Sequence, residues 1–225
     1  MKLQVTLDTV SVEVGIAKLA GVAPYLDIIE VGTPLLLDEG MDAVTKVKDA
    51  YPHVEVLADT KIWHDGMRIS ASAFDSGADM VTVLGGTTDA EIESVVGYAR
   101  ERGKQVGADL SGVPGQVQRA SELEELGVRY MMVPSGLRRP TSGSDDHDAF
   151  HRNTRAMGGN PLALVRNVMR GLSDTAEVAV VDNITLDNVD DVVALRPGVL
   201  LVGRAILSAR DPVAAAQEFK RRMAE

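Results

Sequence analysis

The sequence predicts an α/β fold, a single closed (β/α)8 barrel that spans residues 1–225. Two observations favour it. Short apolar runs alternate eight times with longer helix-like stretches within 225 residues, close to the roughly 250 residues typical of this architecture. The runs are also apolar throughout instead of alternating with polar residues, as expected for parallel strands that are buried on both faces of a sheet.

The eight expected strands are short and rich in β-branched or other apolar residues. Four of them follow a helix-like stretch that ends at a glycine or proline, as in DSGADMVTV and LRPGVLLV. In chain order the strands are residues 3–7, 26–31, 54–58, 79–84, 105–110, 128–133, 177–182 and 198–203.

The stretches between the strands have helical periodicity. The clearest is 41–51, where Met41, Val44, Val47 and Tyr51 recur at three- and four-residue spacing and so share one face. A doubly wound open sheet is the alternative. That fold usually has a glycine-rich fingerprint after its first strand, and here the same position reads LDTVSVE, without glycine.

One segment departs from the regular spacing. Residues 134–159 (PSGLRRPTSGSDDHDAFHRNTRAMGG) are polar, rich in Gly, Ser and Pro, and too long for an ordinary connection. The segment follows the sixth strand, on the side where barrel active sites form. Two interpretations are open, a lid over the site or a disordered insertion.

Composition excludes several classes of protein. The net charge of −10 and the lack of a long basic cluster argue against a nucleic-acid partner. No apolar run approaches the roughly 20 residues that span a bilayer, so we expect no membrane partner. The first ten residues, MKLQVTLDTV, have no apolar signal core. Without cysteine there are neither disulfides nor thiolate metal ligands, and we expect a cytoplasmic protein.

Acidic residues gather where the expected strands end. Because the carboxyl ends of barrel strands form one face, these carboxylates and the nearby Lys61 should lie together. Taken singly, each acid could also be a helix N-cap and Lys61 an exposed loop residue. A group of buried acids needs a lysine or a divalent cation as partner, and oxygen ligands favour Mg²⁺. The acids are Asp8, Glu30, Asp59, Asp109 and Asp182.

The eighth strand ends in Gly203-Arg204. Backbone N–H groups at a helix start, with a guanidinium beside them, suit an anion such as a phosphate. A tight turn is the alternative interpretation of this pair.

Several segments resemble one known family over nearly the whole chain. They are MKLQVTLDT, DIIEVGTPLL, LADTKIWHDG, GADMVTVLG, ADLSGV and LLVGRAI followed by DPVAAAQEF. They are similar to the 3-hexulose-6-phosphate synthase and 3-keto-L-gulonate-6-phosphate decarboxylase group of the orotidine 5′-monophosphate decarboxylase suprafamily. The resemblance implies the barrel already predicted, and a homodimer with its sites near the interface.

The resemblance also implies roles for matching residues. Glu30 and Asp59 correspond to the acids that hold Mg²⁺, and Lys61 to the lysine that stabilises an enediolate together with the metal. Asp8 and Asp109 correspond to acids that line the substrate. Gly203 and Arg204 correspond to the phosphate-binding end of the last strand.

Three positions depart from the family pattern. His64 stands where the family motif Asp-x-Lys-x-x-Asp has its last acid, so it either takes over acid–base work or the role is lost. Pro134 replaces a proton-transferring histidine, for which His147 and His151 are the alternative candidates. Asp182-Asn183 replaces a Gly-Gly phosphate clamp in the substrate-binding region, and because a carboxylate repels a phosphate, either the phosphate shifts or the substrate carries none.

From these features we expect a Mg²⁺-dependent carbon–carbon lyase acting on a ketose-phosphate-like substrate through an enediolate, similar to 3-hexulose-6-phosphate synthase. The alternatives are decarboxylation of 3-keto-L-gulonate 6-phosphate or orotidine 5′-phosphate, and a non-catalytic sugar-binding relic. The three departures predict poor turnover of the ordinary family substrates.

Overall fold

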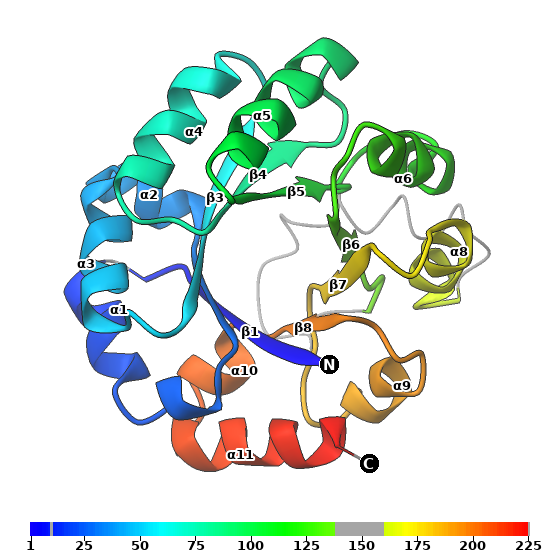
Figure 1. Cartoon of the computed structure of the whole chain (residues 1–225). Helices are drawn as coiled ribbons and strands as arrows, with labels where there is room; N and C mark the ends of the chain where they lie inside the picture. The colour runs from blue at the N-terminus through cyan, green and yellow to red at the C-terminus, as the bar shows by residue number, and fades with distance from the viewer. Residues whose placement is uncertain (10, 138–159, 225) are drawn as a thin grey trace.

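Eight parallel strands close into a barrel in a computed structural model that describes residues 1–9, 11–137 and 160–224. Each strand pairs with the next along the chain, and β8 pairs with β1 through Leu3 and Leu200. Figure 1 looks into this ring and shows the helices outside it. The predicted closed barrel is confirmed. Residues 138–159, which hold most of the segment discussed as a lid and both His147 and His151, lie outside the described residues.

All eight predicted strands are present, within a few residues of the expected ends. They are β1 Lys2–Leu7, β2 Ile28–Val31, β3 Glu55–Ile62, β4 Met80–Leu84, β5 Gln105–Asp109, β6 Tyr130–Pro134, β7 Glu177–Val181 and β8 Val199–Leu201.

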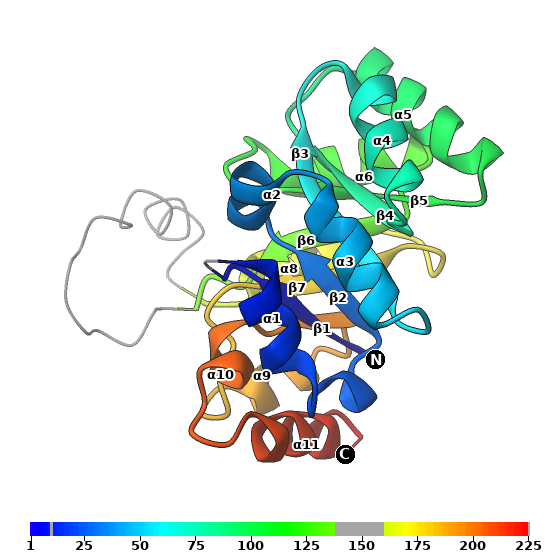
Figure 2. The same cartoon turned by 90° about the vertical axis from the view of Figure 1, so that its left-hand side faces the viewer.

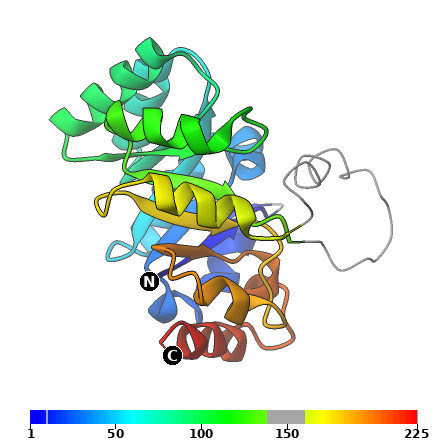
Figure 3. The ribbon, with the colours of Figure 1, turned by 90° about the vertical axis from the view of Figure 1, so that its right-hand side faces the viewer.

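The helices connect these strands and cover the outer face of the barrel (Figures 2 and 3). Figure 3 shows α8 in yellow across β6 and β7, which it contacts. The helices are α1 Val12–Leu19, η1 Ala23–Tyr25, α2 Thr33–Glu39, α3 Asp42–Ala50, α4 Gly66–Asp75, α5 Asp89–Glu101, α6 Gln116–Glu125, α8 Ala163–Gly171, α9 Val189–Val193, α10 Arg204–Leu207 and α11 Pro212–Met223.

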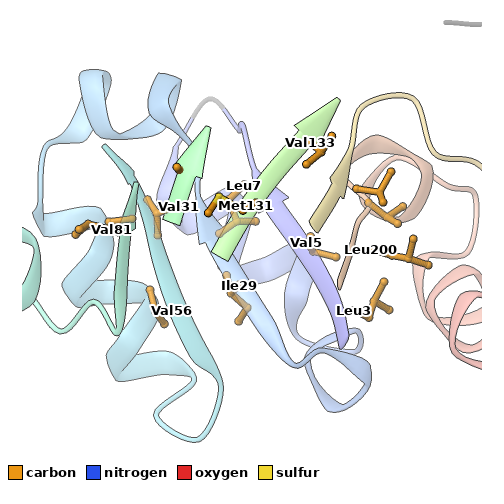
Figure 4. Close-up of a cluster of buried hydrophobic side chains, with 14 of the residues drawn as sticks. Leu3, Val5, Leu7, Ile29, Val31, Val56, Val81, Met131, Val133 and Leu200 are labelled. Carbon is orange, nitrogen blue, oxygen red and sulfur yellow. The ribbon is translucent and has the colours of Figure 1, made fainter. Parts of the chain in front are cut away.

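The strands have two buried faces, as their composition predicts. Strand side chains on the outer face pack against buried side chains of the helices. On α3 the buried helix residues include Val44 and Val47. Figure 4 shows outward-facing side chains from several strands, among them Leu3, Val5, Leu7, Ile29, Val31, Val56 and Val81. A second cluster fills the barrel interior with Ile28, Leu57, Met80, Tyr130, Met132, Ala179, Val181, Val199 and Leu201.

The third strand differs from the prediction. The sequence places its end at residue 58, but β3 continues to Ile62. Its pairing with β4 is regular at Ala58 and shifts before Ile62, which marks an irregularity of the β-bulge kind. Bulges redirect side chains at barrel rims, and this one contains Asp59 and Lys61.

The part of the chain that the structure describes includes no helix long and apolar enough to span a membrane.

Candidate active site

Asp59 lies at the centre of the acids at the carboxyl ends of the strands. Its side chain is 5% exposed. The Thr82 hydroxyl on β4 donates to Asp59 Oδ1 (2.8 Å), and the Thr33 hydroxyl at the start of α2 donates to Oδ2 (2.9 Å). Thr33 and Thr82 come from strand–helix units on either side of β3, so neighbouring units fix the orientation of this carboxylate.

Lys61 bridges two strands with its ammonium group. Its Nζ lies 2.5 Å from Asp109 Oδ2 on β5 and 3.1 Å from Asp59 Oδ2. The Lys61 backbone is left-handed (φ 43°), and its N–H donates to Thr82 Oγ1 (2.9 Å). A left-handed lysine is uncommon and persists where surrounding contacts hold it. The bulge, the unusual backbone and the Thr82 hydroxyl together direct Lys61 between the two acids.

The pKa of Lys61 is raised above its usual value. Burial by itself lowers this pKa, but attraction to Asp59 and Asp109 and the hydrogen bonds to both outweigh that effect. Lys61 is therefore a protonated ammonium near neutral pH. As such it can offset negative charge that develops on a bound molecule, and it acts poorly as a base.

Glu30 is the most deeply buried acid of the group, at 3% exposed on the fully buried strand β2. Its Oε2 accepts a hydrogen bond from Gln4 Nε2 (2.8 Å) on β1. Burial raises the pKa of Glu30 well above its usual value, and the negative charge of Asp59 raises it further. Gln4 and Lys61 oppose this shift without cancelling it.

Asp8 follows β1 at the mouth of the barrel. Its pKa is raised by partial burial and then by Asp59, while Lys61 and Arg204 lower it. A Cβ at Gly32 would lie 2.0 Å from Asp8 Oδ1 and 2.9 Å from the Leu7 carbonyl oxygen. This close approach accounts for the glycine in the EVGTPL segment, because a side chain there would press on the Leu7 carbonyl and displace the Asp8 carboxylate.

These acids suit a divalent cation. The negative charge of Asp59 raises the pKa of both Asp8 and Glu30, and Asp59 and Asp109 share the ammonium of Lys61. Among the described residues no three or more His, Cys, Asp or Glu side chains form a group arranged for a metal ion. A cation here would therefore have two carboxylate ligands at most. The family resemblance indicates Glu30 and Asp59 for this role, and other oxygen donors would complete the shell of a hard ion.

The two positions that depart from the family's proton-transfer residues lie in different surroundings. His64 follows β3, and its side chain is 77% exposed with Nδ1 3.3 Å from Asp65 Oδ2. Pro134 is buried as the last residue of β6 and pairs with Val181. His64 is thus open to solvent or to a partner molecule, whereas Pro134 is a structural part of the barrel.

The expected substrate-binding residues after β7 and β8 lie at the same face. Asp182 and Asn183 have consecutive left-handed backbones (φ 72° and 53°), and the Asp182 carbonyl accepts from the Ser135 hydroxyl at 2.6 Å. Asn183 donates to the Leu137 carbonyl at 3.0 Å, so it holds the start of the segment after β6. Gly203 precedes α10, where the side chain of Arg204 is exposed.

Four residues that orient the acids were not identified by sequence analysis. These are Gln4, Thr33, Thr82 and Tyr130, whose hydroxyl donates to Gln4 Oε1. The sequence did contain a signal for Gln4 and Thr82, since each is a polar residue inside an otherwise apolar strand. Each also lies two residues before a position that faces inward at the mouth, so the alternation of strand side chains places it on the inward face as well. Tyr130 and Thr33 carried no such signal.

Comparison with known proteins identifies similar chains. Residues 1–219 match the family model described as orotidine 5′-phosphate decarboxylase / HUMPS family. A 3-hexulose-6-phosphate synthase of Bacillus subtilis is 33% identical over 220 residues, covering 98% of this chain and 97% of its own. 3-Hexulose-6-phosphate synthase 3 of Staphylococcus saprophyticus is 36% identical with the same coverage.

A crystal structure of 3-hexulose-6-phosphate synthase from Salmonella typhimurium has the same architecture. It superposes with a TM-score of 0.85 at 36% sequence identity, and the match covers 100% of this chain and 99% of the other.

The raised pKa of Glu30 leads to a prediction about pH. The unfolded chain ionises this carboxyl near pH 4.3, whereas the folded chain keeps the proton to higher pH. The free energy of unfolding of the wild type therefore decreases as pH rises from the unfolded-state pKa of Glu30 to its folded-state pKa. Glu30→Gln lacks this titration, so its stability relative to wild type should be greater at pH 8 than at pH 5. Urea unfolding in metal-free buffer measures both, and a pH-independent difference would contradict the prediction.

Thr82 should matter for stability through its hydroxyl. Thr82→Val keeps the shape but leaves Asp59 Oδ1 and the Lys61 N–H each without this partner, which costs about 1–3 kcal/mol. Thr82→Ser retains the hydroxyl and should lose less than half of that in urea unfolding. Thr45→Val, which removes an exposed hydroxyl, is the control. Equal losses for the Val and Ser variants at position 82 would show that the hydroxyl is unimportant.

Proposed function

This chain belongs to the orotidine 5′-phosphate decarboxylase / HUMPS family and is a carbon–carbon lyase, and we propose that it works through an enediolate with Mg²⁺ in the manner of 3-hexulose-6-phosphate synthase. The reaction forms or cleaves a carbon–carbon bond next to the carbonyl of a ketose phosphate. One observation above all supports it. The Lys61 ammonium lies between Asp59 and Asp109, and its positive charge lowers the pKa of Asp8 and of Glu30.

The proposal assigns the metal to Glu30 and Asp59, whose oxygen-only chemistry suits Mg²⁺. When bound, the ion would stabilise negative charge on substrate oxygens. Burial disfavours the charged form of Glu30, and a cation beside it would favour the ionised carboxylate.

The chain's own residues then provide orientation and charge. The Lys61 ammonium is a charged hydrogen-bond donor, and it could donate to the oxygen of a developing enediolate. Asp109 is fixed by the Ser111 N–H (2.8 Å) and by Lys61, and Asp8 lies at the opening, so both can accept from substrate hydroxyls. Gly203 and Arg204 would bind the phosphate.

Proton transfer is where this chain departs most from its family. Pro134 has no proton to give, and we propose that the exposed His64 takes part in acid–base chemistry from across a homodimer interface. Large apolar side chains near these strand ends support an interface, because Leu37 is 81%, Trp63 56% and Met67 55% exposed. All three belong to the segments that follow β2 and β3, and apolar side chains that gather on a surface mark protein–protein contacts.

A sugar-binding relic without catalytic activity is the second candidate. The loss of a histidine at Pro134 and the solvent-facing His64 favour it. The retained ammonium–carboxylate arrangement around Lys61 favours catalysis, because a relic has no need of this costly cluster of buried charges.

The decisive experiment is an assay with Mg²⁺ of two reactions: formaldehyde with ribulose 5-phosphate, and decarboxylation of 3-keto-L-gulonate 6-phosphate. We expect Mg²⁺-dependent turnover of the first reaction, with kcat/KM below about 10⁴ M⁻¹s⁻¹ because of Pro134, His64 and Asp182. A higher value would show that these three departures do not impair catalysis. No turnover of either substrate, with sugar phosphates still binding, would favour the relic.

Lys61 should be essential for turnover. Lys61→Ala leaves Asp59 and Asp109 without their partner, while Lys61→Arg keeps the charge and alters the geometry, which guards against a loss of fold. Both should lower kcat/KM by more than 100-fold, and Lys46→Met at a surface ion pair should not. Activity within tenfold of wild type, roughly 1.4 kcal/mol of barrier, would exclude the enediolate role.

A further inference from the structure

A line of hydrogen bonds crosses the barrel interior beneath the site. The Tyr130 hydroxyl on β6 donates to Gln4 Oε1 on β1, and Gln4 Nε2 donates to Glu30 Oε2 on β2 at 2.8 Å. All three side chains are buried, at 1%, 0% and 3% exposed. The line thus connects opposite walls of the barrel and ends on a proposed metal ligand.

The chemistry of the three groups fixes the direction of the line. Burial raises the pKa of the Tyr130 phenol well above its usual value, and the negative charge of Glu30 raises it further, so the phenol remains protonated. Its proton needs an acceptor, which the amide oxygen of Gln4 provides. The amide NH₂ therefore faces Glu30, whereas a flipped Gln4 would turn its amide oxygen toward the ionised Glu30 carboxylate and place two acceptors against each other.

The barrel is shaped around the tyrosine. The ring of Tyr130 belongs to the apolar interior cluster with Ile28 and Leu57. On the neighbouring strand Gly107 has no side chain, and a Cβ there would lie 2.9 Å from Tyr130 Cδ1. The glycine therefore provides the room in which the ring reaches across to Gln4.

We propose that Tyr130 and Gln4 are positioning residues that hold the Glu30 carboxylate in the orientation required for binding a cation. The inference rests on the proposed function, which assigns Glu30 to the metal. Within the described residues, the bond from Gln4 to Oε2 is the one hydrogen bond that this carboxylate accepts. That bond fixes the rotation of the carboxylate about its last torsion and leaves lone pairs on both oxygens with which Glu30 could bind a cation.

Orientation of a ligand by an outer partner has a measurable signature. Loss of such a partner typically weakens metal binding by about 10–100-fold. A purely structural role would instead lower the stability of the fold and leave the affinity of the folded protein unchanged. Magnesium affinity and stability therefore have to be measured on the same variants.

The test is calorimetric titration of the full chain with MgCl₂, beside thermal unfolding without metal. Tyr130→Phe removes the hydroxyl, and Gln4→Asn shortens the amide so that it cannot reach both neighbours; the second variant keeps the test valid if the first does not fold. Tyr51→Phe is the matched control, since its hydroxyl bonds the Ile16 carbonyl outside the barrel interior.

We expect Tyr130→Phe and Gln4→Asn to weaken the Mg²⁺ Kd by at least about tenfold, and Tyr51→Phe to leave it within twofold. A wild-type affinity retained by both barrel variants would overturn the inference and leave the proposed function intact. If wild type itself binds no Mg²⁺, the metal assignment of the proposed function and this inference both fail.

Discussion

Closing a parallel sheet into a barrel forces the carboxyl ends of its strands together, and in this chain that means bringing like charges together. The negative charge of Asp59 raises the cost of ionising Glu30 and Asp8, and the Lys61 ammonium forms ion pairs with Asp59 and Asp109. The surrounding hydroxyl and amide donors serve this cluster, because buried carboxylates are tolerated when they accept hydrogen bonds. The cluster therefore determines which polar residues the barrel interior holds.

The fold and the grouping of the acids could be predicted from sequence, and the orientation of the acids could not. Apolar runs specify buried parallel strands, and strand ends in a barrel converge by geometry, so the proximity of Asp59 to Asp109 follows from pattern alone. The extension of β3 through Lys61 depends on a bulge and a left-handed backbone, which no periodicity encodes. Likewise, the contact of Tyr130 with Gln4 depends on strand register across the whole barrel.

Two of the three departures from the family pattern lie on one side of the site, and His64 lies apart from them, after β3. Pro134 and Asp182 end the adjacent strands β6 and β7, and Ser135 joins them by donating to the Asp182 carbonyl. The half that holds Glu30, Asp59 and Lys61, on β2 to β5, has an extensive network of donors. The same barrel thus combines a densely bonded charge cluster on one wall with a differently composed wall opposite, which suits altered substrate selection with retained charge stabilisation.

The bulge in β3 separates two parts of the strand that are held by different kinds of hydrogen bond. Before the bulge, β3 is in register with β2 from Glu55 to Ala58 and is part of the hydrogen-bonded wall of the barrel. Above it, residues 59–61 are held by hydroxyl groups of neighbouring units and not by a continuous ladder. The position of the rim side chains and the closure of the barrel therefore depend on separate sets of contacts, the first on hydroxyl groups of neighbouring units and the second on the paired strands below.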